Sequence, residues 1–121
     1  MGIRKHHELR VWSEAISLVK EIYHITSMFP REELYGLISQ MRRAAVSVAS
    51  NIAEGAARSG NREFMHFLYM VRGSLSELEI QVTVAKELDY LHNDSRLDSK
   101  LDATFGLLGG LIKSPQGRRG K

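Results

Sequence analysis

The sequence predicts an all-α fold: an antiparallel up-down-up-down four-helix bundle whose copies assemble into a homo-oligomer. Apolar residues recur three and four positions apart in four separate segments of the 121 residues, which is the spacing of amphipathic helices. The connections between these segments are short, so successive helices are expected to lie side by side and to reverse direction. Two segments carry more apolar surface than one bundle buries, and such surface on a soluble protein indicates a partner, most often another copy.

The first helix is expected from Leu9 to about Met28. Its apolar stripe alternates between spacings of three and four and comprises Leu9, Trp12, Ile16, Val19 and Tyr23. Four further apolar residues widen this stripe: Ala15, Leu18, Ile22 and Ile25. The pattern predicts an amphipathic helix. Pro30 should end it, because proline disfavours helical geometry in the residue before it.

The second helix follows a connection over residues 31–35 and is expected to reach about Arg58. Its core stripe comprises Leu37, Met41, Ala45, Val48 and Ile52. One flank extends the apolar sector to roughly 200°, where packing on one core requires about 100°. That flank comprises Tyr35, Ile38, Val46, Ala49, Ala53 and Ala56. Small residues dominate it and allow close approach, so this helix is predicted to have neighbours on two sides.

The third helix starts after the turn Ser59-Gly60-Asn61 and is expected to reach about Asp89. Its seam is an unbroken heptad pattern, which predicts packing at a shallow angle: Phe64, Leu68, Val71, Leu75, Leu78, Val82 and Ala85. The opposite face is not cleanly polar, since it carries Tyr69, Gly73, Ser76, Ile80 and Val84. Gly73 costs about 1 kcal/mol relative to alanine inside a helix. A close contact with another helix would explain it, and simple tolerance of a glycine is the alternative.

The fourth helix follows residues 90–94, with Asp94 or Ser95 as its cap. Its apolar positions are Leu97, Leu101, Phe105, Leu108 and Ile112. Residues 8–112 therefore form the predicted bundle. Residues 1–7 are expected to be a flexible leader, and residues 113–121 a disordered basic tail that is too polar and glycine-rich to pack.

Composition and motifs exclude several classes of protein. The chain has no cysteine, so disulfide scaffolds and thiol nucleophiles are excluded. No apolar run approaches the roughly 20 residues that span a bilayer, and the polar start lacks a secretory signal, so a cytoplasmic protein with no membrane partner is expected. HExxH, phosphate-loop and GxSxG motifs are absent, and Glu63 with His66 forms one Glu-x-x-His pair where a di-iron bundle needs two. We expect no enzyme, no catalytic residue, no cofactor and no metal.

The net charge of +3 is unevenly distributed. Residues 36–75 hold five arginines and two glutamates, whereas residues 76–112 hold three bases and seven acids. Any anion-binding face of the folded body should therefore come from the middle segment, and its candidates are Arg42, Arg43, Arg58 and Arg62. Guanidinium groups suit phosphate, and repetition in an oligomer would add many weak contacts. The alternative is that these arginines form salt bridges between subunits with Glu32, Glu33 or Glu54. The candidate residues of the oligomer interface are Tyr35, Val46, Ala49, Ala53, Tyr69, Gly73, Ile80 and Val84.

Three stretches carry a resemblance to a known family: LRVWSEAISLVKEIY, FPREELYGLISQMRRAAVSVASNIAEGAAR and FMHFLYMVRGSLSELEIQVTVAKELDYL. Over about residues 8–92 the chain resembles the bacterial four-helix-bundle proteins encoded in intervening sequences of 23S ribosomal RNA genes, which are also labelled S23 ribosomal proteins. It is similar in turn to the accessory variability determinant of diversity-generating retroelements. The motifs that carry the resemblance include Tyr35-Gly36-Leu37, Asn51-Ile52-Ala53-Glu54-Gly55 and Gly73-Ser74-Leu75.

The resemblance implies a homopentameric barrel of four-helix bundles with a central pore. Its retroelement relatives bind nucleic acid and a reverse transcriptase through basic surfaces. We therefore expect a non-enzymatic, oligomeric accessory factor that binds RNA or DNA weakly, with a nucleic-acid enzyme such as a reverse transcriptase as a candidate partner. The alternative is a structural or protein-interaction module with no nucleic-acid role.

Overall fold

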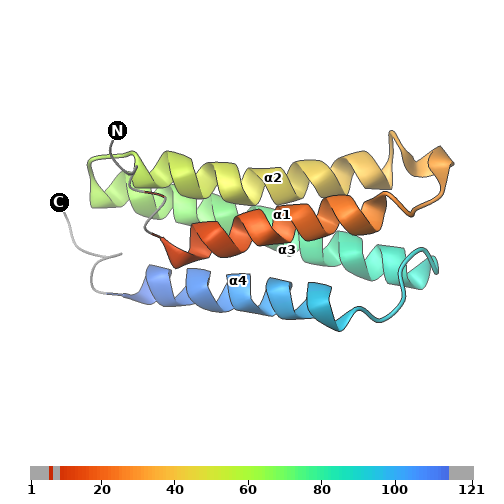
Figure 1. Cartoon of the computed structure of the whole chain (residues 1–121). Coiled ribbons are helices and arrows are strands. Elements are labelled where there is room, and N and C mark those ends of the chain that lie inside the picture. The colour runs from red at the N-terminus through yellow and green to blue at the C-terminus, as the bar shows by residue number, and fades with distance from the viewer. Residues whose placement is uncertain (1–5, 7–8, 115–121) are drawn as a thin grey trace, which may run out of the picture.

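The computed structural model describes residue 6 and residues 9–114, and this part of the chain is all-α without strands. Its elements are α1 (Arg10–Thr26), the short 3-10 helix η2 (Arg31–Glu33), α2 (Leu37–Ala56), α3 (Asn61–Glu87) and α4 (Ser95–Lys113). Figure 1 shows the four long helices side by side, with the α2–α3 connection at one end and the other two connections at the opposite end. The prediction of an all-α protein with four helices is confirmed.

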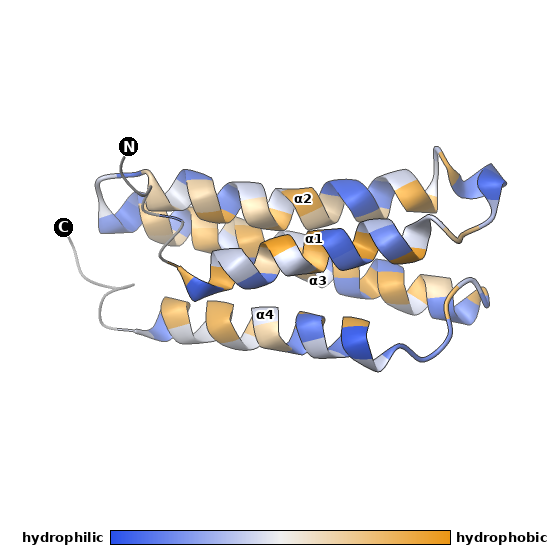
Figure 2. Ribbon diagram, viewed as in Figure 1, coloured by the Kyte–Doolittle hydropathy of each residue, from blue (hydrophilic) through white to orange (hydrophobic). Residues whose placement is uncertain are grey.

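The predicted leader, apart from His6, and the predicted tail beyond Ser114 lie outside the described residues. Within the described part, no helix combines the length and the apolar character that crossing a membrane requires. In Figure 2 hydrophobic and hydrophilic residues alternate along each helix, as expected for amphipathic helices that share one core.

The core forms where the inner faces of the four helices meet. The α2 stripe is buried except for the half-buried Leu37, and the α3 stripe is buried except for the half-buried Phe64. In α4, Leu97, Leu101 and Leu108 are buried, and Thr104 joins them with its hydroxyl donating to the Lys100 carbonyl at 2.7 Å. Full burial of one large aliphatic side chain contributes about 1.5–3 kcal/mol, so these stripes hold the bundle together.

The stripe expected to dominate α1 does not face the core. Ile16 is 36% exposed and Tyr23 is 44% exposed, while Leu9, Trp12 and Val19 are half-buried. The buried residues are instead Val11, Ala15, Leu18, Ile22 and Ile25, a face roughly a third of a turn away. α1 contacts both α2 and α4, so the face of α1 that is turned toward both of these helices is the buried one. The predicted stripe of larger residues lies on a flank.

Three helices end two residues before their predicted ends. α1 ends at Thr26, α2 at Ala56 and α3 at Glu87. α3 stops where Asp89 adopts a φ of 62°, a left-handed conformation that aspartate tolerates better than most side chains. Asp94 is the cap of α4, since its carboxylate accepts a hydrogen bond from the Leu97 N–H at 3.1 Å.

Glu33 joins the two connections at one end of the bundle. Its Oε1 accepts from the Leu37 N–H at 3.1 Å, and its Oε2 accepts from the Tyr90 hydroxyl at 2.9 Å. One carboxylate therefore satisfies a free N–H at the start of α2 and fixes the α3–α4 connection against η2. At the opposite end Gly55 lets α2 and α3 approach closely: a Cβ built there would lie 2.7 Å from Phe67 Cβ.

Candidate functional site

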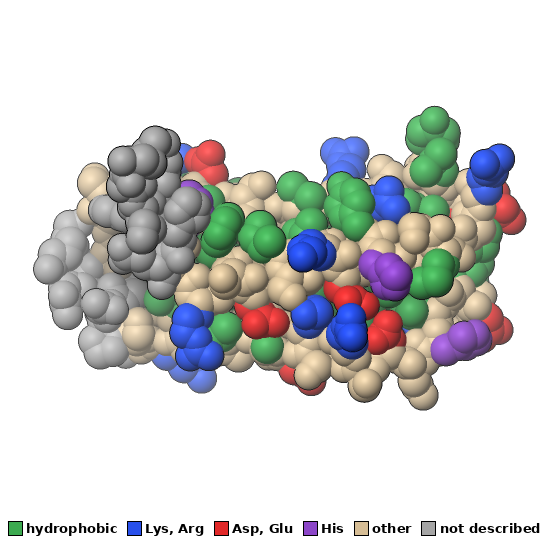
Figure 3. Space-filling view, in the orientation of Figure 1, with side chains coloured by type: hydrophobic (Ala, Val, Ile, Leu, Met, Phe, Trp, Pro, Cys, Tyr) green, Lys and Arg blue, Asp and Glu red, His purple; other side chains and the backbone are tan. Residues whose placement is uncertain are grey.

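An open hollow of about 760 Å³ lies over α1, α2 and the connection between them. We call it the α1–α2 hollow; it is lined by Tyr23, Leu34, Tyr35, Ile38, Ser39, Arg42, Arg43, Val46 and Ser47. Tyr35 is 92% exposed, and Tyr23, Leu34 and Val46 are each more than 40% exposed. Figure 3 shows hydrophobic side chains grouped over this side of the molecule with Lys and Arg side chains among them. The hollow is therefore an apolar surface with basic groups beside it.

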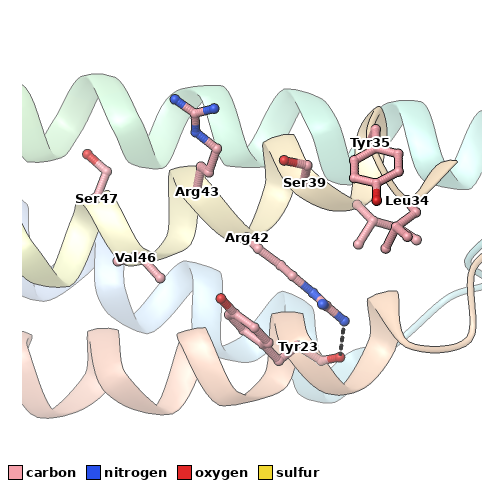
Figure 4. Close-up of a pocket in the computed structure, with 9 residues that line it drawn as sticks. Tyr23, Leu34, Tyr35, Ser39, Arg42, Arg43, Val46 and Ser47 are labelled. Carbon is pink, nitrogen blue, oxygen red and sulfur yellow. Dashed lines mark hydrogen bonds between the residues drawn. The ribbon is translucent and has the colours of Figure 1, made fainter.

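Arg42 spans the hollow from α2 to α1, as Figure 4 shows. Its Nε donates to Thr26 Oγ1 at 2.9 Å, and its Nη2 donates to the Tyr23 carbonyl at 3.4 Å. The guanidinium also lies 4.5 Å from the centroid of the Tyr23 ring, within the range of a cation–π contact. Thr26 Oγ1 in turn donates to the Ile22 carbonyl at 2.6 Å. Arg42 thus ties α2 to α1, and part of its donor capacity is already used.

Arg43 points away from α1 in Figure 4 and is exposed. Within the part of the chain that the structure describes, it makes no hydrogen bond or ion pair. It also lines a groove between α2 and α3 with Gln40, Ala44, Ser47, Ser74 and Glu77. The floor of this groove is a polar seam, because Ser47 Oγ and Ser74 Oγ share a hydrogen bond of 2.9 Å and Asn51 Nδ2 donates to Ser47 Oγ at 3.0 Å. The polar side of α2 therefore packs in part against α3.

A second basic hollow, of about 450 Å³, lies where α2 ends and α3 begins. We call it the α2–α3 corner; it is lined by Arg58, Arg62, Glu63, His66 and Phe67. Arg58 Nη2 pairs with Glu54 Oε1 at 3.0 Å, and the two residues are four positions apart. Its guanidinium lies 4.7 Å from the centroid of the Phe67 ring. Arg62 is exposed and makes no hydrogen bond or ion pair with any residue in the described ranges.

The four candidate arginines form two pairs rather than one patch. Arg42 and Arg43 line the α1–α2 hollow, and Arg58 and Arg62 line the α2–α3 corner. At about 1.5 Å per residue, the two pairs are separated by roughly 20 Å along α2. A continuous basic stripe would therefore require repetition of the chain in an assembly.

Most of the candidate interface residues are exposed. Tyr35 and Val46 belong to the hollow, and an outer stripe on α3, opposite its core face, comprises Tyr69, Gly73, Ile80 and Val84. We call this the α3 outer stripe. A Cβ added at Gly73 would meet nothing within 4 Å, so no contact inside the protomer requires that glycine. Ala53 is half-buried, whereas Ala49 is 7% exposed and packs in the core of its own chain, which leaves it little surface for a neighbour.

Several residues of these surfaces were not predicted to belong to them. Leu34 was expected in a connection and Tyr23 in the core stripe of the first helix, yet both line the hollow. Phe67 and His66 line the corner, and each follows a lining residue, Glu63 or Arg62, by four positions on the same helix. In the described ranges no group of three or more acidic, histidine or cysteine side chains is placed to hold a metal ion.

The family model of the 23S rRNA-intervening sequence protein matches residues 7–109. The chain belongs to this family. The match covers α1, α2 and α3 in full and most of α4, so both surfaces of this intervening-sequence protein lie within it. No curated protein matches the chain. The family resemblance expected from the sequence is thereby confirmed, while the finer similarity to the retroelement accessory determinant stays a prediction.

Proposed function

We propose that this intervening-sequence protein is a non-enzymatic protein that assembles as a homopentamer of antiparallel up-down-up-down bundles. The observation that carries the proposal is apolar side chains exposed on two separate surfaces of one chain. Tyr35 is 92% exposed in the hollow, and Ile80 is 64% exposed on the α3 outer stripe. Burial of both surfaces against other copies would remove this apolar area from water. The connections at alternate ends in Figure 1 support the antiparallel order.

Size-exclusion chromatography of the double variant Tyr35→Ser/Ile80→Ser tests this assembly. The variant should elute later than the wild type, because each change removes apolar surface from the proposed contacts. Met28→Ser is the matched control, since Met28 is 66% exposed and belongs to neither surface. Unchanged elution of the double variant would show that these two surfaces do not hold the copies together.

As an assembly, the protein binds RNA or DNA weakly through Arg42, Arg43, Arg58 and Arg62. Arg43 and Arg62 support this role because both are exposed and neither has a hydrogen-bond or ion-pair partner within the described chain. Each neutralised phosphate releases counterions, so contacts repeated around an assembly add to a useful affinity. Filter binding across a salt series tests it. Retention of RNA or DNA on the filter should fall steeply as the salt concentration rises, and no retention at about 50 mM salt would contradict the proposal.

A structural or protein-interaction role without nucleic acid is the second candidate. Arg42 favours it, because its guanidinium is committed to Thr26 and Tyr23 and borders exposed apolar side chains. This candidate predicts that Arg42→Ala/Arg43→Ala dissociates the assembly. The nucleic-acid role predicts instead that the assembly persists and its affinity for RNA or DNA falls.

The resemblance to the retroelement accessory determinant extends the proposal to a cytoplasmic accessory factor of a nucleic-acid enzyme such as a reverse transcriptase. Support comes from the sequence motifs Tyr35-Gly36-Leu37 and Gly73-Ser74-Leu75. Co-purification of the tagged protein with a reverse transcriptase from the same cells tests this partner. Recovery of the assembled protein without any such enzyme would count against it.

A further inference from the structure

The α2–α3 corner brings cationic and aromatic side chains to one hollow. We propose that this corner binds an unpaired nucleotide of single-stranded RNA or DNA. The inference rests on the proposed nucleic-acid role and identifies which form of nucleic acid is recognised and where. The hollow of about 450 Å³ is within the size range of small-ligand sites.

Arg58 and Phe67 supply a stacking surface. The Arg58 guanidinium lies 4.7 Å from the centroid of the Phe67 ring, and its ion pair with Glu54 restrains it there. The guanidinium therefore lies over the ring of Phe67. The Arg58 side chain is nevertheless 40% exposed, so part of it is accessible to a base from solvent. Unpaired bases stack on arginine planes and aromatic rings, whereas bases in a duplex are already stacked on their neighbours.

Arg62 supplies the contact to phosphate. Its side chain is exposed, and it has no hydrogen-bond or ion-pair partner in the part of the chain that is described. The planar fork of donors on a guanidinium matches the oxygens of a phosphate group. His66 follows Arg62 by four residues, so it lies one turn along the same face of α3 and borders the same hollow.

Glu63 also lines the hollow, and its carboxylate favours binding of a nucleotide over binding of a simple anion. Its carboxylate repels a free phosphate ion. The same carboxylate accepts a hydrogen bond from the amino group of a base such as cytosine. A stacking surface, one carboxylate and an arginine without a partner in the described ranges together fit a base with its phosphate better than phosphate alone.

Fluorescence anisotropy with a labelled oligonucleotide of about 12 nucleotides, as a single strand and as a duplex, tests the inference at low salt. The wild-type assembly should bind the single strand more tightly than the duplex. Phe67→Leu keeps an apolar side chain but removes the ring, and Arg62→Gln removes the charge. Each should weaken single-strand binding roughly fivefold or more, and Phe67→Tyr should restore it. Arg96→Gln is the matched control, because Arg96 is exposed at the start of α4, at the far end of the bundle.

The outcomes separate the corner from the broader proposal. If the wild type binds the single strand but Phe67→Leu and Arg62→Gln bind equally well, the corner inference fails while nucleic-acid binding stands. Tighter binding of the duplex also overturns the corner inference. Replacement of chloride by inorganic phosphate at constant ionic strength should not displace the oligonucleotide, and full displacement would reduce the corner to a simple anion site. If the wild type binds neither form, both proposals fall.

Discussion

Gly55 is the point at which α2 and α3 come closest, and Gly55→Ala is predicted to destabilise the fold. The new Cβ would lie 2.7 Å from Phe67 Cβ and 3.3 Å from Phe64 Cδ1. Phe67 Cβ is fixed to the α3 backbone, so the clash is relieved only by a shift between the two helices. Such overpacking costs about 1–3 kcal/mol. Alanine is more favourable than glycine inside a helix by roughly 1 kcal/mol, and this gain is smaller in the last turn of α2, where Gly55 lies.

We therefore expect a net loss of about 1–2 kcal/mol in the free energy of unfolding. Urea denaturation followed by circular dichroism measures it, at one protein concentration because assembly also contributes to stability. Gly106→Ala is the control: Gly106 is exposed within α4, and a Cβ there would meet nothing within 4 Å. That variant should gain up to about 1 kcal/mol. If Gly55→Ala were as stable as the wild type, the close approach of α2 and α3 would not exist as described.

Two further predictions concern hydrogen bonds that join elements. Thr26→Val removes the buried hydroxyl that accepts a hydrogen bond from Arg42, and it should lower the free energy of unfolding in urea by about 1–2 kcal/mol. Thr83→Val is the control, because it removes an exposed hydrogen bond to a carbonyl of its own helix. It should change the free energy of unfolding by less than about 0.5 kcal/mol. The hydrogen bond to Glu33 raises the pKa of Tyr90, with desolvation and the charges of Glu33 and Glu32 as lesser causes. The folded state therefore holds this proton more tightly than the unfolded state does. The wild type should be more stable than Tyr90→Phe below about pH 10, and this difference should shrink as the pH rises through the folded pKa. A difference in stability that stays constant with pH would contradict the prediction.

The sequence predicted the core faces of α2 and α3. The heptad seam of α3 and the stripe of α2 are buried almost throughout, because each stripe lies on the face where the helices of the bundle meet. The core face of α1 was predicted wrongly. This helix carries two adjacent apolar faces, and the choice between Leu18 and Tyr23 as core depends on where α2 and α4 lie, which periodicity does not encode.

The candidate site was predicted in part. Charge and position in the sequence were enough to predict the candidates Arg42, Arg43, Arg58 and Arg62. Only the structure shows that the Arg42 guanidinium is hydrogen-bonded to Thr26, whereas that of Arg43 has no partner in the described chain. The corner also depends on a contact between two helical segments, because the turn after α2 brings the Phe67 ring next to the Arg58 guanidinium. No spacing rule along a single helix predicts that contact.

The most direct test of the central claim is the mass of the wild-type protein in solution by light scattering. One chain has a mass of 13.7 kDa, and the exposed α1–α2 hollow and α3 outer stripe predict a stable species of several chains, five if the family resemblance holds. A species of 13.7 kDa that persists across working concentrations would contradict self-assembly and leave the two arginine pairs too far apart to act together.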